Sequence, residues 1–180
     1  VIINGILLGY EGVDLDISVP ANVSLIADLS FENSNIRSLS FESRTSEITI
    51  GAKAFQGSVN LTSVNLTDWI REVEYRAFYN THWIDNLPSL FISTENKLLM
   101  YIGRNTNIEI ASNITSMAYG VFTNNKSISS VRFNTTSQNE FFIPENSFNG
   151  CTSLNSVTLP SKAYIGKDAF KGTLWLIGKG

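Results

Sequence analysis

Large apolar residues recur at fixed distances from a repeated phenylalanine. The six anchors are Phe31, Phe55, Phe78, Phe122, Phe148 and Phe170. Five residues before them stand Ile26, Ile50, Val73, Met117, Ile143 and Ile165. Three residues after them stand compact, mostly polar residues: Ser34, Ser58, Thr81, Asn125, Cys151 and Thr173. A register that holds six times predicts an internal repeat. We expect the compact side chain to turn inward where the chain reverses and to bond backbone groups left unpaired there.

Apolar residues alternate with polar ones in the segment after each compact residue. Examples are Leu61, Val64 and Leu66, and Ile128, Val131 and Phe133. Period-two alternation predicts short strands. Each repeat of about 23 residues then contains a strand, a turn, an extended stretch and one brief helical or 3₁₀ turn at Ala-Phe. Such a unit cannot bury its own apolar face, so it must stack on neighbours as a solenoid.

The long interval between Phe78 and Phe122 contains an insertion. Residues 6–12 align with residues 97–103, at an offset of 91, and Trp83 aligns with Trp175 at an offset of 92. Residues 1–10 contain Asn-Gly between apolar stretches, which predicts a β-hairpin with a type I′ turn, and residues 91–101 contain a weaker version of the same signal. We therefore predict one leucine-rich-repeat solenoid, an α/β repeat of six turns with β-hairpin insertions, over residues 1–180, with internal modules 1–88 and 89–180.

The residues resemble the BspA-like leucine-rich repeats of bacterial and some protozoan surface proteins. That family's pattern is fullest in residues 148–160, which read FNGCTSLNSVTLP, and it continues through the Ile-Gly-x-x-Ala-Phe of residues 165–170. The central turns depart from it, since only Gly51 and Gly166 keep the glycine after Ile, and cysteine occurs once. The resemblance implies a non-enzymatic surface protein that adheres to host matrix proteins or to other cells.

Charge and composition point to no nucleic acid and no membrane insertion. The formal net charge is −3, so no excess of basic residues favours binding to a nucleic acid. Hydrophobic residues make up 43% of the chain, but no apolar run is long enough to span a membrane. The chain begins at Val1 without a methionine or a signal-peptide pattern, so we expect a fragment of a longer secreted or cell-surface protein. Neither end reads as a polar cap, which predicts self-association through the ends of the solenoid.

Catalytic and metal-binding patterns are weak. His82 is the single histidine, and Cys151 occupies the compact repeat position, where a buried structural thiol is expected. The acidic pairs Asp14 and Asp16, and Glu72 and Glu74, read as solvated strand faces rather than as a calcium or acid/base site. No cofactor is implied, and we expect no enzyme.

Aromatic residues outside the repeat pattern are the better candidates for ligand contact. Trp69 has no counterpart in the second module and neighbours Arg71, so both are candidate contacts, together with His82 and Trp83. Trp83 recurs as Trp175, which favours packing of the hairpin onto the repeat. If the source is eukaryotic, Asn-x-Ser/Thr sequons offer glycosylation sites at Asn22, Asn60, Asn65, Asn113 and Asn134.

These observations predict a module that binds a protein partner, such as a host extracellular-matrix protein or another cell-surface protein. A structural spacer or stalk that projects another domain, and a carbohydrate-binding module, are the alternatives.

Overall fold

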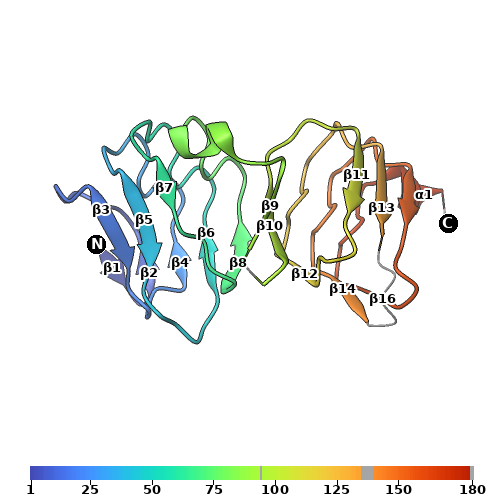
Figure 1. Ribbon diagram of the computed structural model, residues 1–180, viewed down its shortest axis with the longest axis horizontal. Helices are drawn as coiled ribbons and strands as arrows, with labels where there is room; N and C mark the ends of the chain where they lie inside the picture. Colours follow the sequence, from blue (N-terminus) through green and yellow to red (C-terminus); the bar gives the residue numbers. More distant parts are fainter. Residues whose placement is uncertain (94, 135–139, 179–180) are drawn as a thin grey trace. The chain divides into compact units, whose positions relative to one another are not determined.

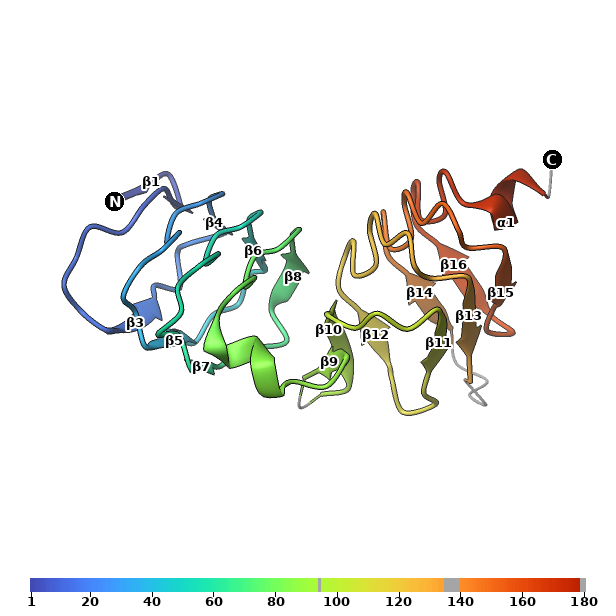
Figure 2. The same cartoon turned by 90° about the horizontal axis from the view of Figure 1, so that it is seen from above.

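The computed structural model describes residues 1–93, 95–134 and 140–178. The chain forms two compact units, Val1–Leu87 and Pro88–Gly180, and their boundary lies one residue before the predicted module boundary. Figures 1 and 2 show the solenoid turns of each unit. A single continuous solenoid over both units stays a prediction.

The first unit contains two sheets (Figure 1). One has the order β1-β2-β4-β6-β8, with β1 Ile2–Ile3, β2 Ile6–Leu7, β4 Leu25–Ile26, β6 Ile48–Ile50 and β8 Ile70–Val73. The other has the order β3-β5-β7, with β3 Asp16–Val19, β5 Ser38–Phe41 and β7 Ser63–Val64. The unit ends in the 3₁₀ helix η1, His82–Asn86. Successive turns thus contribute one strand to each sheet, except that β1 is added by the hairpin and β8 of the last turn is followed by η1 instead of a strand.

The second unit repeats this plan (Figure 2). One sheet has the order β12-β10-β9, and a separate two-stranded sheet pairs β14 with β16. These strands are β9 Leu90–Ile92, β10 Lys97–Tyr101, β12 Ser116–Met117, β14 Phe141–Ile143 and β16 Ala163–Ile165. Contacts between β12 and β14 join these strands in one row. The other sheet is β11-β13-β15, with β11 Asn107–Ile110, β13 Ser130–Phe133 and β15 Ser156–Thr158. Helix α1, Leu174–Ile177, stands where η1 stands in the first unit.

Both predicted hairpins are confirmed. β1 and β2 pair antiparallel, and Asn4 and Gly5 between them have φ values of 51° and 76°, as a type I′ turn requires. β9 and β10 also pair antiparallel, with Asn96 at φ 63°. The second strand of each hairpin pairs in parallel with the next strand of the solenoid, so that Leu7 lies opposite Ile26 and Leu98 opposite Met117. The hairpins therefore begin the row in which the apolar residues five before phenylalanine lie.

A ladder of stacked aromatic rings runs through the core of each unit. Neighbouring anchor rings stack with centroids 4.8–5.1 Å apart, in the order Phe31, Phe55, Phe78 and in the order Phe122, Phe148, Phe170. A hairpin tyrosine contacts the first ring of each ladder, and a tryptophan contacts the last; these are Tyr10 and Trp83, and Tyr101 and Trp175. Stacked aromatic pairs contribute about 0.5–1.5 kcal/mol each beyond burial, so the ladder is a main source of stability.

The Ala-Phe segments are hydrogen-bonded turns, not the helical or 3₁₀ turns that the sequence predicted. The residue two before each anchor has a positive φ of 54–60°, in Leu29, Lys53, Arg76, Gly120, Asn146 and Asp168. The residue two after each anchor also has a positive φ, of 55–74°, in Asn33, Gly57, Asn80, Asn124, Gly150 and Gly172. Left-handed residues on both sides stop a right-handed helix from forming around the phenylalanine.

Four of the six compact residues three after the anchors donate a hydrogen bond to a carbonyl group at the chain reversal, whereas Ser34 bonds the Ser58 hydroxyl and Asn125 accepts the Ser127 amide. The Ser58 hydroxyl donates to the Phe31 carbonyl at 2.6 Å, and the Cys151 thiol donates to the Phe122 carbonyl at 2.9 Å. Thr81 and Thr173 donate to the carbonyls of the phenylalanines three residues before them. All four side chains are buried, so a polar atom at this position satisfies an acceptor that water cannot reach.

Candidate functional site

Trp69 and Arg71 lie at the start of β8, on the surface of the first unit. The Trp69 side chain is 43% exposed, while its backbone carbonyl accepts the Ile48 amide at 2.9 Å. The Arg71 guanidinium lies 3.5 Å from the Glu47 carboxylate, and both side chains are about half exposed. Trp69 therefore offers an aromatic surface on a fixed backbone, next to an ion pair that is largely screened by solvent.

His82 and Trp83 lie beyond the next turn, at the start of η1. His82 is exposed. The Trp83 side chain is only 7% exposed, and its ring meets Phe78 edge to face with centroids 4.7 Å apart. Trp83 is therefore a core residue at the end of the ladder and offers little surface to a ligand. The four candidate residues come from two separate segments of the first unit.

An exposed cation between two aromatic rings was not singled out in the sequence. The guanidinium carbon of Arg76 lies 5.0 Å from the centroid of the Tyr75 ring and 4.8 Å from that of Tyr79. The tyrosines are 60% and 52% exposed. We call these three residues the Arg76 clamp. Neither tyrosine belongs to the repeat pattern, so the criterion that picked out Trp69 would also have found them.

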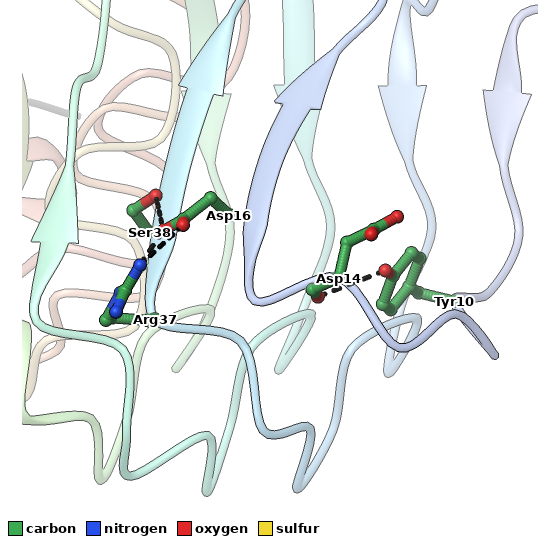
Figure 3. Close-up of polar contacts among 5 residues, drawn as sticks. All are labelled: Tyr10, Asp14, Asp16, Arg37 and Ser38. Atoms are coloured by element: carbon green, nitrogen blue, oxygen red, sulfur yellow. Dashed lines mark hydrogen bonds and ion pairs between the residues drawn. The ribbon is translucent and has the colours of Figure 1, made fainter.

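The sheet β3-β5-β7 carries a cluster of polar residues where strands β3 and β5 begin (Figure 3). Arg37 pairs with Asp16 at 2.6 Å, and the Ser38 hydroxyl donates to the same carboxylate at 2.7 Å. The hydrogen bond from Arg37, with that from Ser38, lowers the pKa of Asp16. In the second unit the corresponding Asn107 accepts hydrogen bonds from Ser129 and Ser130. The two units thus share a hydrogen-bonded strand position, but only the first unit places an ion pair there.

A shallow depression of about 480 Å³ lies beside this cluster, lined by Leu15, Asn35, Arg37, Asn60 and Thr62. The lining offers amides, a hydroxyl and an exposed leucine. Its cation is already paired with Asp16, so the depression has little charge to offer an anionic ligand.

Potential acid/base and metal chemistry finds little support in the described residues. Asp16 is paired with Arg37, and the Tyr10 hydroxyl donates to the backbone carbonyl of Asp14 (Figure 3). Burial, followed by the nearby Asp28, raises the pKa of Glu74. Within residues 1–93, 95–134 and 140–178, no three His, Cys, Asp or Glu side chains cluster as metal ligands would. Burial raises the pKa of the Cys151 thiol to about 11, which makes it a poor nucleophile at neutral pH.

The sequons differ in how much of each the structure describes. Asn22, Asn60, Asn65 and Asn113 are exposed, and so is Asn134, although the threonines of its sequon lie outside the described residues. The sequence contains a sixth sequon at Asn125. The Asn125 side-chain oxygen accepts the Ser127 amide at 3.0 Å, so its side chain is engaged in a local turn.

Short parallel strands wound around a ladder of phenylalanines define this protein as a leucine-rich-repeat solenoid. The chain belongs to the BspA type leucine rich repeat region family, whose model matches it in six copies over residues 24–142 and 86–177. The fold class and the family resemblance inferred from the sequence are thereby confirmed. No helix in the described parts of the chain is long and apolar enough to cross a membrane.

Two solved structures are similar to this chain. A crystal structure of a leucine-rich repeat protein of T. pallidum is 20% identical, with a TM-score of 0.43, and the match covers 94% of this chain and 81% of that one. The pneumococcal vaccine antigen PcpA is 13% identical, with a TM-score of 0.41, and the match covers 83% of this chain and 51% of that one. A comparison with curated proteins gives no significant match.

Proposed function

We propose that this chain is a non-enzymatic binding module of a cell-surface or secreted protein, and that it adheres to a protein of a host or of the extracellular matrix. The observation that carries the proposal is the exposure of Trp69, Tyr75 and Tyr79 on the last solenoid turn of the first unit. Tyrosine, tryptophan and arginine supply most of the binding energy at protein interfaces. These three rings do not belong to the aromatic ladder, so their surfaces are available to a partner.

Membership of the BspA type family supports the same proposal, because stacked repeats offer an extended surface on which residues outside the ladder are free to vary. Cys151 and Trp83 are buried in the core and are not accessible to a partner, whereas the aromatic residues at the surface are accessible.

The test measures, by biolayer interferometry, the binding of the recombinant 180-residue chain to immobilised fibronectin, fibrinogen and mucin. We expect saturable binding to at least one protein, weakened about five- to thirtyfold by Trp69→Ala, which corresponds to about 1–2 kcal/mol. Tyr164→Ala is the matched control, because that aromatic residue is 56% exposed but lies in the second unit.

Absence of binding to every protein in the panel would contradict adhesion and favour a spacer that only projects a neighbouring domain. Binding to mucin that is lost after enzymatic removal of its glycans would instead identify a carbohydrate-binding module. The cellular location has its own test, since a surface protein is labelled by antibody on intact cells and is removed by brief protease treatment.

A further inference from the structure

The Arg76 clamp combines an exposed cation with two exposed tyrosine rings. Its guanidinium contacts the faces of Tyr75 and Tyr79, and in the described part of the chain no carboxylate pairs with it. By contrast, Arg37 and Arg71 each pair with a carboxylate of their own unit. The planar fork of donors on Arg76 is therefore open to a ligand outside this chain.

The backbone of the clamp is held by the neighbouring solenoid turn. The carbonyl of Tyr75 accepts the Lys53 amide at 3.0 Å, and the carbonyl of Tyr79 accepts the Gly57 amide at 2.9 Å. The Tyr79 amide donates to the Arg76 carbonyl at 3.0 Å. The backbone around Arg76 is therefore already ordered, so a ligand has to order only the exposed side chains.

The corresponding position in the second unit is closed by its own charges. At an offset of 92, Arg76 becomes Asp168 and Tyr79 becomes Lys171. The Lys171 ammonium lies 3.4 Å from the Asp168 carboxylate. The same turn geometry therefore exists without an aromatic clamp, so the fold does not require Arg76 and its two tyrosines.

The backbone at Arg76 supports the same point. Its φ of 55° is in the left-handed region, which is costly for a residue with a Cβ and which Gly120 occupies at the same position of another turn. Glycine would suit the local geometry better than arginine.

We propose that the Arg76 clamp binds a carboxylate of an acidic peptide segment whose apolar side chains pack on Tyr75 and Tyr79. The guanidinium edge matches a carboxylate in a bidentate geometry while its faces remain on the rings. The inference rests on the proposed function, because it names the partner as a protein. A polyanionic glycan fits less well, because it carries no apolar side chains to pack on the two exposed tyrosine rings.

The experiment measures, by fluorescence anisotropy, the binding of a fluorescein-labelled peptide to the full 180-residue chain. In this peptide glutamate alternates with leucine. We expect binding that weakens about ten- to a hundredfold in Arg76→Gln, because a charge-assisted bidentate contact is lost. Arg76→Lys should recover only part of the affinity, because it restores the charge but not the fork. Arg132→Gln is the matched control, since it removes an exposed arginine of the second unit.

A further variant separates loss of folding from loss of binding. Arg76→Gly suits the left-handed backbone, so we expect a melting temperature no lower than that of the wild type together with the same loss of peptide binding. The proposal is overturned if the wild type does not bind the peptide, if a peptide with glutamine in place of glutamate binds equally well, or if Arg76→Gln binds normally. It is also overturned if heparin binds in preference to the peptide.

The clamp and the proposed function can fail separately. Peptide binding that depends on Arg76, with no binding to any protein of the panel, would retain the clamp and reject the adhesion targets. Panel binding that Arg76→Gln leaves unchanged would retain adhesion and reject the clamp as its site.

Discussion

Three glycines of the second unit allow the cost of the left-handed turn position to be separated from the cost of crowding. Gly150 and Gly172 follow their anchors by two residues and have φ values of 72° and 73°. Gly178, at the end of α1, has a φ of −72°. The perturbation is replacement of each by alanine.

The structure predicts a graded loss. At Gly178 an added Cβ meets no atom closer than 3.4 Å, so the free energy of unfolding should change by less than about 0.5 kcal/mol or rise slightly. At Gly172 the nearest atoms would be 3.8 Å away, and only the left-handed backbone is costly. That cost is about 1–2 kcal/mol, offset in part by a less flexible unfolded chain, which leaves a loss of about 1 kcal/mol.

Gly150→Ala should be the most damaging of the three. An added Cβ would clash with the side-chain amide of Asn124 in the neighbouring turn. Asn124 is exposed and its side chain can move aside, so the crowding costs less than the roughly 1–3 kcal/mol of a packed core, and we expect a total loss of about 1.5–2 kcal/mol. Because all three glycines lie in the second unit, the same unfolding transition reports on each.

The assay is urea denaturation followed by circular dichroism, with the free energy of unfolding taken by linear extrapolation. Equal stability of Gly172→Ala and Gly178→Ala would refute the cost assigned to the positive φ. A loss in Gly150→Ala no larger than that in Gly172→Ala would refute the role assigned to the contact with Asn124.

Other consequences of the structure can be measured directly. Phe148→Ala should destabilise the chain by about 3–5 kcal/mol in the same assay because its ring is fully buried, whereas Phe142→Ala, at a side chain 49% exposed, should cost less than about 1 kcal/mol. Cys151 is buried with a pKa of about 11, so iodoacetamide at mildly alkaline pH should label it only after unfolding, and rapid labelling of the folded chain would contradict its assigned burial. The pKa of Asp16 is lowered mainly by the hydrogen bond from Arg37, so the stabilisation from this pair should be present above the usual range of aspartate and be lost as the pH falls through the lowered pKa. An NMR titration should show the pKa of Asp16 rising toward its usual value in Arg37→Gln, and an unchanged value would contradict the assignment.

The repeat register and the hairpins could be predicted because each depends on chemistry local to the chain. Six phenylalanines with an apolar residue five positions before them define which side chains face inward, and Asn4-Gly5 specifies a turn with positive φ. The left-handed residues two after each anchor are Asn or Gly at all six positions, which is a sequence signal for a positive φ. That signal favours a tight turn over the helical turn predicted from Ala-Phe.

The binding candidates were less predictable, because exposure depends on the neighbouring solenoid turn. Trp69 and Trp83 are both tryptophans near the end of the first unit, but one is 43% exposed and the other 7%. The recurrence of Trp83 as Trp175 favoured packing, and the ladder explains it. Repeats are informative about core residues, which must recur, and far less so about surface residues, which need not.

The sequence by itself determined the solenoid, its period and its aromatic core, since these follow from spacings that repeat along the chain. Only the tertiary structure brought Tyr75, Arg76 and Tyr79 into one clamp and showed that Asp168 and Lys171 neutralise the equivalent place in the second unit. The physical reason is that ring and charge contacts depend on where the turn points each side chain. That direction is set by the left-handed residues and by the hydrogen bonds of the adjacent turn.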